Sequence, residues 1–292
     1  MDIVITYVDC NDPVWRQDYE KFTNMPLMQK RYRDWGTLKY LLRGIDSRMS
    51  FIRNVYMVVS HPTQVPDWVD TDNLKIVLHS DIIPSEYLPV FNSAAIEMFL
   101  HKIDGLDEQY IYFNDDTFPV GNCVPEDFFY DGRISTGFSK HFLATGMYKK
   151  HCRNSDWMSR KALNMKTSLV FVRPQHACTP MLRSQCSEVF DKMEAEILPT
   201  ISRLRTNDNV NQYLFLDYMY YNGKVRVRKT SNKHFSVAVA SAETIAEFIR
   251  NPYRTFCCIN DVQMSNEKFC QMRDTITEAF EDVFPEKSRF EK

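Results

Sequence analysis

Several features that define common protein classes are scarce or absent in this chain of 292 residues. It contains only 8 glycines, which disfavours a glycine-rich all-β architecture. No apolar run reaches the roughly 18 residues that a membrane-spanning helix requires. Neither GxxxxGK[ST] nor GxGxxG occurs, so neither a P-loop nor a nicotinamide-binding fold is supported. The net charge of −2 differs from the clearly basic charge of general nucleic-acid binders, so we expect no nucleic-acid partner.

The cysteines and the N-terminus also lack familiar signals. The eight cysteines include no CxxC pair, so metal-ligand spacing is missing and a zinc site is not favoured. The opening stretch MDIVITYVD has no basic n-region and no small-residue cleavage site, so it does not resemble a signal peptide. We therefore expect reduced, mostly buried thiols in a cytoplasmic protein.

What the sequence does contain is an alternation of strand-like and helix-like segments. Strands are predicted at residues 2–8, 54–59, 75–78, 109–113, 168–172, 224–228 and 255–259. Apolar residues at helical spacing predict helices within 38–49, 96–103, 182–197, 209–221 and 269–283. This alternation predicts an α/β fold of Rossmann-like type, with a mostly parallel twisted sheet and helices on both faces.

The domain prediction is a single catalytic domain over residues 1–292. Within it, the polar and charged stretch 141–166 is interpreted as a surface loop or lid, and 177–222 as a helical subregion. A basic patch in and beside this loop suggests peripheral association with the inner membrane surface, although a solvated loop is the simpler interpretation. Its residues are Lys149, Lys150, Arg153, Arg160 and Lys161.

Four predicted strands end in residues that can carry chemistry. The segment QYIYFNDDTFPVG ends its apolar run at Asn114, Asp115 and Asp116. The other three strands end at Asp9, Asn11 and Asp12, at Asn260 and Asp261, and at Arg173 and His176. Ligands of open parallel α/β sheets bind at the carboxyl ends of the strands, so parallel neighbours would gather these side chains at one edge. Taken singly, each Asp or Asn could equally be a turn residue or a helix cap.

The adjacent carboxylates Asp115 and Asp116 repel each other unless a cation compensates them. Oxygen ligands of this kind suit Mg²⁺ or Mn²⁺, whose remaining positions are filled by water and phosphate oxygens. Cationic side chains that match phosphate stand just ahead of two predicted helices, although solvated arginines are an equal alternative. They are Arg31, Arg33, Arg203 and Arg205, with Asp208 as a candidate helix cap. These patterns indicate a divalent metal that holds a diphosphate.

The same residues carry a family resemblance that covers almost the whole chain. DIVITYVDCNDPVW (2–15) and the stretch from RYRDWGTLKYLLRGI to FNDDTFPVG (31–121) are similar to the first two conserved regions of the Stealth family. Residues 175–224 and 252–291 are similar to its third and fourth regions. This family includes bacterial capsule-polysaccharide phosphotransferases and the lysosomal-enzyme N-acetylglucosamine-1-phosphotransferase. The chain departs from the family pattern at Cys10-Asn11, at Trp35-Gly36-Thr37 and at Val262, beside the acids rather than at them.

The resemblance implies a nucleotide-sugar-transferase-like fold and the transfer of a sugar-1-phosphate from a UDP-sugar to a glycan or lipid-linked glycan hydroxyl. A phosphodiester would form and UMP would leave, in capsule or cell-surface polysaccharide synthesis. His176 would be the general base, with Asp116 and Arg205 also catalytic, and Asp115, Asp116 and Asp261 would hold Mg²⁺ or Mn²⁺. The predicted substrate-binding residues are Asp9, Asn11, Asp12, Arg31, Arg33, Asp34, Asn92, Asn114, Asp208 and Asn260.

Two alternatives remain from the residues themselves. A metal-dependent glycosyltransferase with the same donor needs the same sheet and the same acids, but it breaks the bond at the anomeric carbon and releases UDP. A catalytically inactive scaffold that binds nucleotide-sugars is a further alternative, although none of the acids or the histidine is degraded here.

Overall fold

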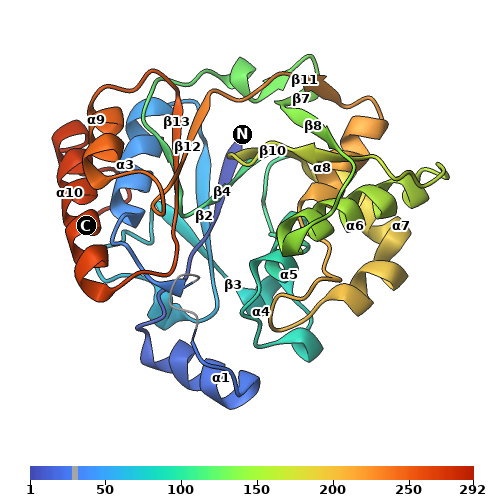
Figure 1. The fold of residues 1–292 in the computed structure, drawn as a ribbon, viewed down its shortest axis with the longest axis horizontal. Helices are drawn as coiled ribbons and strands as arrows, with labels where there is room; N and C mark the ends of the chain where they lie inside the picture. Colours follow the sequence, from blue (N-terminus) through green and yellow to red (C-terminus); the bar gives the residue numbers. More distant parts are fainter. Residues whose placement is uncertain (28–31) are drawn as a thin grey trace. The chain divides into compact units, whose positions relative to one another are not determined.

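The computed structural model describes residues 1–27 and 32–292, and these form two compact units, each built from three separate segments (Figure 1). Unit 1 comprises Met1–Val4, Val77–Tyr112 and Pro125–Thr230. Unit 2 comprises Ile5–Ile76, Phe113–Val124 and Ser231–Lys292. The sequence predicts one domain over 1–292, whereas the described residues cluster into these two interleaved units.

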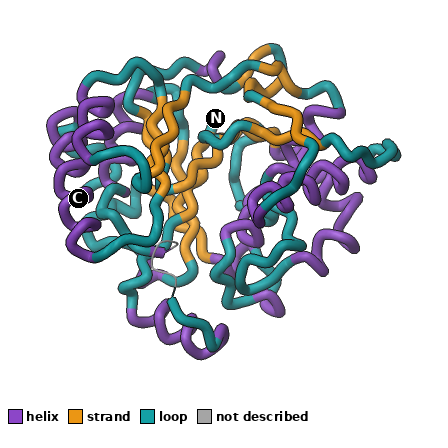
Figure 2. Tube along the Cα trace, viewed as in Figure 1, coloured by secondary structure: helices purple, strands orange, loops and turns teal. Residues whose placement is uncertain are grey.

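Short strands form the sheets, and longer helices accompany them (Figure 2). The strands are β1 (Asp2–Thr6), β2 (Asn54–Val59), β3 (Leu74–Leu78), β4 (Gln109–Asn114), β5 (Thr117–Pro119), β6 (Phe129–Tyr130), β7 (Arg133–Thr136), β8 (Phe138–His141), β9 (Phe171–Pro174), β10 (Thr179–Leu182), β11 (Val225–Val227), β12 (Asn232–Ser236) and β13 (Phe256–Asn260). One five-stranded sheet has the order β10-β4-β1-β2-β3, and smaller sheets have the orders β11-β7-β6, β12-β13-β5 and β8-β9.

The α-helices vary from single turns to five turns. They are α1 (Pro13–Thr23), α3 (Leu38–Arg48), α4 (His79–Ile82), α5 (Ser93–Glu97), α6 (Gly146–Ala162), α7 (Arg183–Ile197), α8 (Tyr213–Tyr221), α9 (Ala242–Arg250) and α10 (Asn266–Val283). No helix among the described residues combines the length and the apolar character needed to cross a bilayer.

Unit 1 packs its helices around the aromatic helix α8. Seven consecutive residues of α8, Tyr213–Met219, are buried, and α6 and α7 pack against it. The hydroxyl of Ser159 on α6 donates a hydrogen bond of 3.0 Å to the Leu214 carbonyl of α8. In the same unit, β10 runs antiparallel to β4, with Thr179 opposite Tyr112. This packing fixes the segment that precedes α8, which contains two of the predicted site residues.

Unit 2 fixes the segment that follows β4 against β13. β5 pairs antiparallel with β13, with Thr117 opposite Cys258, and β12 pairs parallel with β13. Helix α3 lies close to β5, because a Cβ added to Gly44 would approach the Pro119 carbonyl to 2.8 Å. Phe280 of α10 stacks on Tyr40 of α3 with ring centroids 5.4 Å apart. The backbone around Asp115 and Asp116 is therefore adjacent to β5, which is itself packed against β13 and α3.

The predicted α/β class is confirmed, with mixed rather than uniform strand directions. Parallel pairing occurs between β12 and β13 and between β11 and β7, and antiparallel pairing between β10 and β4, β13 and β5, and β8 and β9. The sequence interpretation required the four strands with polar ends to be neighbours in one sheet. The structure shows instead that they belong to three different sheets. β1 and β4 belong to the five-stranded sheet, β13 to a three-stranded sheet, and β9 pairs with β8.

Two further local predictions need correction. Residues 146–162, assigned from sequence to a surface excursion, form the 17-residue helix α6. The predicted helix over 96–103 is interrupted, because α5 ends at Glu97 and a separate 3₁₀ turn follows at Leu100–Lys102. The prediction of mostly buried cysteines is confirmed, because seven of the eight are buried and Cys270 is exposed.

Candidate active site

The predicted site residues divide between the two units. Unit 2 contains Asp9, Asn11, Asp12, Arg33, Asp34, Asn114, Asp115, Asp116, Asn260 and Asp261. Unit 1 contains Asn92, His176, Arg205 and Asp208. Arg31 lies outside the described residues.

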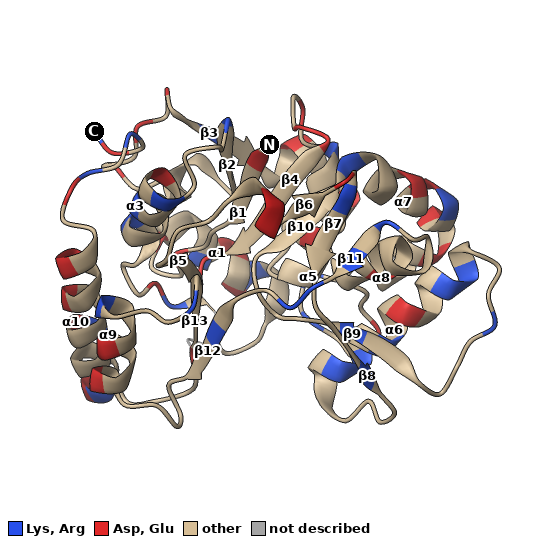
Figure 3. Ribbon diagram, turned by 90° about the horizontal axis from the view of Figure 1, so that it is seen from above, with Lys and Arg blue, Asp and Glu red and all other residues tan. Residues whose placement is uncertain are grey.

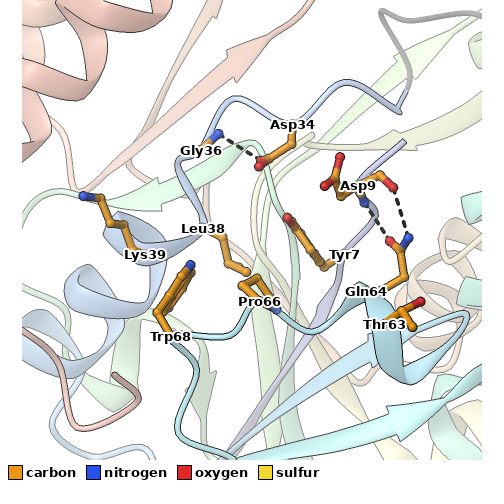
Figure 4. A pocket seen from close by; sticks show the side chains of 10 residues that line it. All are labelled: Tyr7, Asp9, Asp34, Gly36, Leu38, Lys39, Thr63, Gln64, Pro66 and Trp68. Carbon is orange, nitrogen blue, oxygen red and sulfur yellow. Dashed lines mark hydrogen bonds between the residues drawn. The ribbon is translucent and has the colours of Figure 1, made fainter. Parts of the chain in front are cut away.

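A pocket of about 180 Å³ in unit 2 contains two of the predicted residues, Asp9 and Asp34 (Figure 4). One part of its wall is apolar and aromatic. Another part contains the carboxylates of Asp9 and Asp34, with the Tyr7 side chain between them. The residues that line it are Tyr7, Asp9, Asp34, Gly36, Leu38, Lys39, Thr63, Gln64, Pro66 and Trp68. The pocket combines apolar surface with a few polar groups, which is the usual character of a small-molecule site.

The loop after β1 is shaped by its own polar residues. The Asp9 backbone N–H donates to the Gln64 side chain at 2.7 Å, and the Gln64 amide donates back to the Asp9 carbonyl at 3.0 Å (Figure 4). The Asn11 backbone N–H donates to the Asp9 carboxylate at 2.8 Å. Asp12 caps α1, since its carboxylate accepts the Trp15 N–H at 2.7 Å. Burial opposes ionisation of Asp12, but the hydrogen bonds it accepts lower its pKa overall.

Asp34 and Tyr7 form a polar pair in the pocket. The Asp34 carboxylate accepts the Gly36 N–H at 2.9 Å and interacts with the Tyr7 hydroxyl. Burial raises the pKa of Asp34, and the charge of Asp9 adds to this effect. Burial, followed by the negative charge of Asp34, raises the pKa of the Tyr7 hydroxyl well above its ordinary value. Tyr7 therefore keeps its proton and can donate a hydrogen bond at any ordinary pH.

The two adjacent acids occupy the connection between β4 and β5. The Asp116 carbonyl accepts the Ile259 N–H of β13 at 2.9 Å, and its carboxylate accepts the Thr117 hydroxyl at 3.1 Å. Burial raises the pKa of Asp115 to about 7, and the charges of Asp116 and Asp34 add to this effect. The charges of Asp116 and Asp34 thus disfavour the ionised form of Asp115 within unit 2. A bound cation would relieve this repulsion directly.

Asp34 and Asp116 lie close enough to Asp115 for their charges to raise its pKa. Carboxylate oxygens such as these are the ligand type that Mg²⁺ and Mn²⁺ prefer. The thiol of Cys258 lies within 4.8 Å of a carboxylate oxygen of Asp116. Burial raises the pKa of this thiol well above its ordinary value, so it remains a neutral thiol and a poor ligand for such ions.

Asp261 is engaged by a cation from its own unit. The Arg33 guanidinium donates to both of its oxygens at 2.9 Å, and the Trp35 indole N–H donates to one of them at 3.2 Å. The side chains of Arg33 and Asp261 are only 9% and 12% exposed. Arg33 also lies over the Phe269 ring, 4.1 Å from its centroid. The structure therefore pairs a predicted phosphate ligand with a predicted metal ligand.

His176 lies in an aromatic environment in unit 1. The Tyr213 hydroxyl lies 3.5 Å from His176 Nδ1, and the Tyr148 hydroxyl lies 2.9 Å from that of Tyr213. The rings of Tyr148 and His176 are arranged edge to face with centroids 6.4 Å apart. His176 is half-buried, so the surrounding tyrosines restrict its orientation while leaving it access to solvent.

Glu97 is a site residue that sequence reasoning missed. It is 5% exposed, and it accepts the Gln212 N–H at 3.1 Å and the Tyr112 hydroxyl at 3.4 Å. Burial raises the pKa of Glu97, whereas the nearby charges of Arg205 and His176 act in the opposite direction. The available signal was a lone acid inside the apolar run AAIEMFL, because buried carboxylates are rare unless they are paired.

The remaining predicted residues of unit 1 have local structural partners. Asn92 is fully buried and caps α5, where it accepts the Ala94 N–H at 3.1 Å. Arg205 is exposed and donates a hydrogen bond to the Ser93 hydroxyl. Asp208 is exposed and does not cap α8, which begins five residues later with Gln212 before it. The segment before α8 turns through Asn209 instead, which accepts the Thr206 N–H at 2.8 Å.

The amino-acid sequence matches a known family. Residues 31–136 match the family description "Stealth protein CR2, conserved region 2". The chain is 30% identical over 263 residues to a capsular polysaccharide phosphotransferase of Actinobacillus suis, covering 84% of this chain and 70% of that protein. It is 27% identical over 332 residues to the receptor polysaccharide phosphotransferase WefC of Streptococcus oralis, covering 100% and 99% of the two chains.

Among solved structures, the galactosyltransferase LgtC with donor and acceptor sugar analogues aligns with a TM-score of 0.46 and 8% identity, covering 97% of this chain and 96% of that one. The sequence relatives carry the assignment. The chain therefore belongs to the Stealth family and is a phosphotransferase.

Proposed function

We propose that this phosphotransferase transfers a sugar-1-phosphate from a UDP-sugar to a hydroxyl group of a glycan acceptor. A phosphodiester forms and UMP leaves. The observation that carries the proposal is the group of carboxylates around Asp115, whose pKa of about 7 reflects burial and the charges of Asp116 and Asp34. A site that binds a diphosphate through a divalent cation requires such a concentration of negative charge.

The pocket of Figure 4 is the site assigned to the nucleotide. Trp68, Pro66 and Leu38 supply an apolar wall for a base, and the Tyr7 hydroxyl and Asp34 carboxylate supply polar contacts for its edge or for a ribose. Asp9 lines the pocket, and Asn11 and Asp12 follow it in the chain. In this proposal, the pocket binds the nucleotide through contacts that do not involve the transferred sugar.

Asp115 and Asp116 would hold Mg²⁺ or Mn²⁺, with Asn114 beside them. Such an ion would supply positive charge that neutralises the charge developing on the leaving monophosphate. Asp261 acts through Arg33, because the 2.9 Å ion pair fixes that guanidinium in position. Asn260 is exposed at the end of β13, where an amide is available to a sugar hydroxyl.

His176 is assigned the role of general base. The Tyr213 hydroxyl near Nδ1 orients the imidazole, and the carboxylate of Glu97 stabilises the imidazolium that forms when a proton is accepted. Arg205 is exposed and attached to the N-terminus of α5 through Ser93, so its charge is available to a phosphoryl group.

In the reaction step, the acceptor oxygen forms a bond to the phosphorus that carries the sugar. The bond from that phosphorus to the bridging oxygen breaks, and the electron pair leaves with UMP. The hydroxyl proton of the acceptor passes to His176. The sugar retains its bond to its own phosphate throughout, which distinguishes this reaction from glycosyl transfer.

Identification of the released nucleotide tests the proposal. The protein is incubated with UDP-sugars, Mg²⁺ or Mn²⁺ and candidate glycan acceptors, and the nucleotide product is resolved by chromatography. UMP that depends on both metal and acceptor is the expected result. UDP as the product would establish glycosyl transfer instead, and donor binding without turnover on any acceptor would indicate an inactive scaffold.

A further inference from the structure

Unit 1 exposes a group of large apolar side chains at one end of the antiparallel strand pair β8–β9. Phe142, Leu143 and Leu169 are 61%, 63% and 73% exposed, and Val170 is 41% exposed. The last residue pair of these strands is His141 opposite Phe171, so residues 142–143 and 169–170 leave the strands at the same end. We call these four side chains the apolar tip.

The segment that carries the tip is also strongly basic. Residues 138–174 contain eight Lys or Arg residues and one acid, a formal charge of +7 in a protein whose net charge is −2. The single acid, Asp156, is fully buried and paired with Arg160 at 2.8 Å. Lys and Arg residues, blue in Figure 3, occur along β8, α6 and β9. A segment that combines exposed apolar side chains with a strong positive charge matches a partner that is both apolar and anionic.

The structure distinguishes the available cations from those already engaged. Arg160 pairs with Asp156, Lys161 pairs with Glu196 at 2.6 Å, and Arg153 lies over the Trp157 ring. These residues belong to the basic patch predicted from sequence, and they stabilise α6 and its neighbours. By contrast, four lysines form no ion pair within residues 1–27 and 32–292. They are Lys140, Lys149, Lys150 and Lys166.

We propose that the apolar tip and these four lysines form a docking surface for an anionic lipid bilayer. The apolar side chains enter the boundary between headgroups and acyl chains, and the lysines contact the headgroup phosphates. A protein partner is a poorer match, because lysine is depleted in protein–protein interfaces. Attachment needs no membrane-spanning helix, since two weak terms, apolar insertion and charge attraction, act together.

The test is co-sedimentation of the full chain with vesicles of phosphatidylcholine, with and without phosphatidylglycerol. Binding is expected only to vesicles that contain phosphatidylglycerol, and it should weaken at high salt because the lysine contribution is screened. The double variant Phe142→Ser/Leu143→Ser and the double variant Lys149→Gln/Lys150→Gln should each reduce the partition coefficient about tenfold or more.

The chain offers matched controls for these variants. Val239 and Tyr253 in unit 2 are 90% and 67% exposed, so Val239→Ser and Tyr253→Ser remove equally exposed apolar surface outside the tip. Both control variants should bind vesicles like the native protein. The unfolding temperature of every variant is compared with that of the native protein, because loss of binding through misfolding would lower it.

A second measurement places the tip in the membrane. Leu143→Trp should become quenched by brominated phosphatidylglycerol more strongly than the native protein, whereas Val239→Trp should not. Equal binding to neutral vesicles would overturn the proposal, and so would native binding by both the Phe142→Ser/Leu143→Ser and the Lys149→Gln/Lys150→Gln variants. Sedimentation velocity tests whether a second copy of the chain covers the apolar tip instead. The proposal would also be overturned if the native protein were a dimer that does not bind vesicles and the Phe142→Ser/Leu143→Ser variant were a monomer.

Discussion

The Arg33 guanidinium and the Asp261 carboxylate lie 2.9 Å apart although 228 residues separate them in the chain. Trp35 completes this arrangement with a hydrogen bond to the same carboxylate, and Phe269 packs beneath the guanidinium. The pair thus attaches the segment 32–36 to the end of β13 inside unit 2. The Arg33–Asp261 ion pair should therefore stabilise the fold of unit 2.

Arg33→Ala should lower the free energy of unfolding by about 3 kcal/mol, because Asp261 would remain nearly buried without its cation. Urea denaturation followed by circular dichroism measures this difference. Arg250→Ala is the matched control, since it breaks an Arg–Asp pair whose side chains are 36% and 54% exposed. That control should cost less than about 1 kcal/mol. Equal losses in the two variants would contradict the role given to the buried pair.

Asp115 should make stability depend on pH. A carboxyl with a folded pKa of about 7 holds its proton more tightly than in the unfolded chain, where the pKa is about 3.9. The stability that Asp115 contributes to the folded state is therefore fully present below a pH of about 4. It decreases as the pH rises from about 4 through about 7, and it stays constant at higher pH.

Asp115→Asn removes this titration. The variant should be more stable than the native protein at alkaline pH, by about 2 kcal/mol after allowance for partial access to water. Urea midpoints measured across the acid-to-alkaline range should differ progressively between the two proteins. Parallel curves would show that Asp115 titrates like an ordinary surface acid.

Metal binding should distinguish Asp116 from Asp261. Asp116→Ala removes a proposed ligand, so titration calorimetry with Mn²⁺ should show at least tenfold weaker binding on general grounds of lost coordination. Asp261→Asn should leave Mn²⁺ affinity nearly unchanged, because this carboxylate already serves Arg33 and Trp35. The reverse order of effects would return Asp261 to the role of metal ligand.

His176→Ala should lower kcat by on the order of 10²–10⁴-fold with little change in donor affinity.

Glu97→Gln keeps an oxygen that can accept the Gln212 N–H but removes the negative charge near His176. Its effect should therefore fall on kcat and on the acid limb of the pH profile, with KM for the donor preserved. A loss confined to thermal stability would make Glu97 a purely structural residue.

The sequence predicted those parts of the fold whose buried residues are apolar. Strand β2 begins and ends where predicted, at 54 and 59, because all but its first residue are buried and apolar. Helix α6 was missed for the opposite reason. Its buried residues are His151, Cys152, Ser155, Asp156 and Ser159, a stripe at helical spacing made of polar and small side chains. Hydrophobic periodicity has no signal for such a helix.

The candidate site shows the same limit in another form. Local motifs made Asp9, Asp115 and Asp116 candidates, since each lies within three residues of the end of a strand. No motif could supply the partner of Arg33, because the pairing depends on how distant segments fold together. Glu97 was passed over because its neighbours Ile96 and Met98 made the run look like ordinary core.

Unit 2 takes its segments from the first, middle and last parts of the chain, residues 5–76, 113–124 and 231–292. During synthesis, Asp9 and Asp34 emerge long before Asp261, and β5 waits for β13 to be translated before it can pair. Long-range pairing of this kind is slow, and the unfinished chain exposes its apolar strands until the ribosome releases the C-terminal helices. The carboxylate site therefore cannot mature on a partly translated chain, so a prematurely stopped product should require chaperones or be degraded rather than compete for donor.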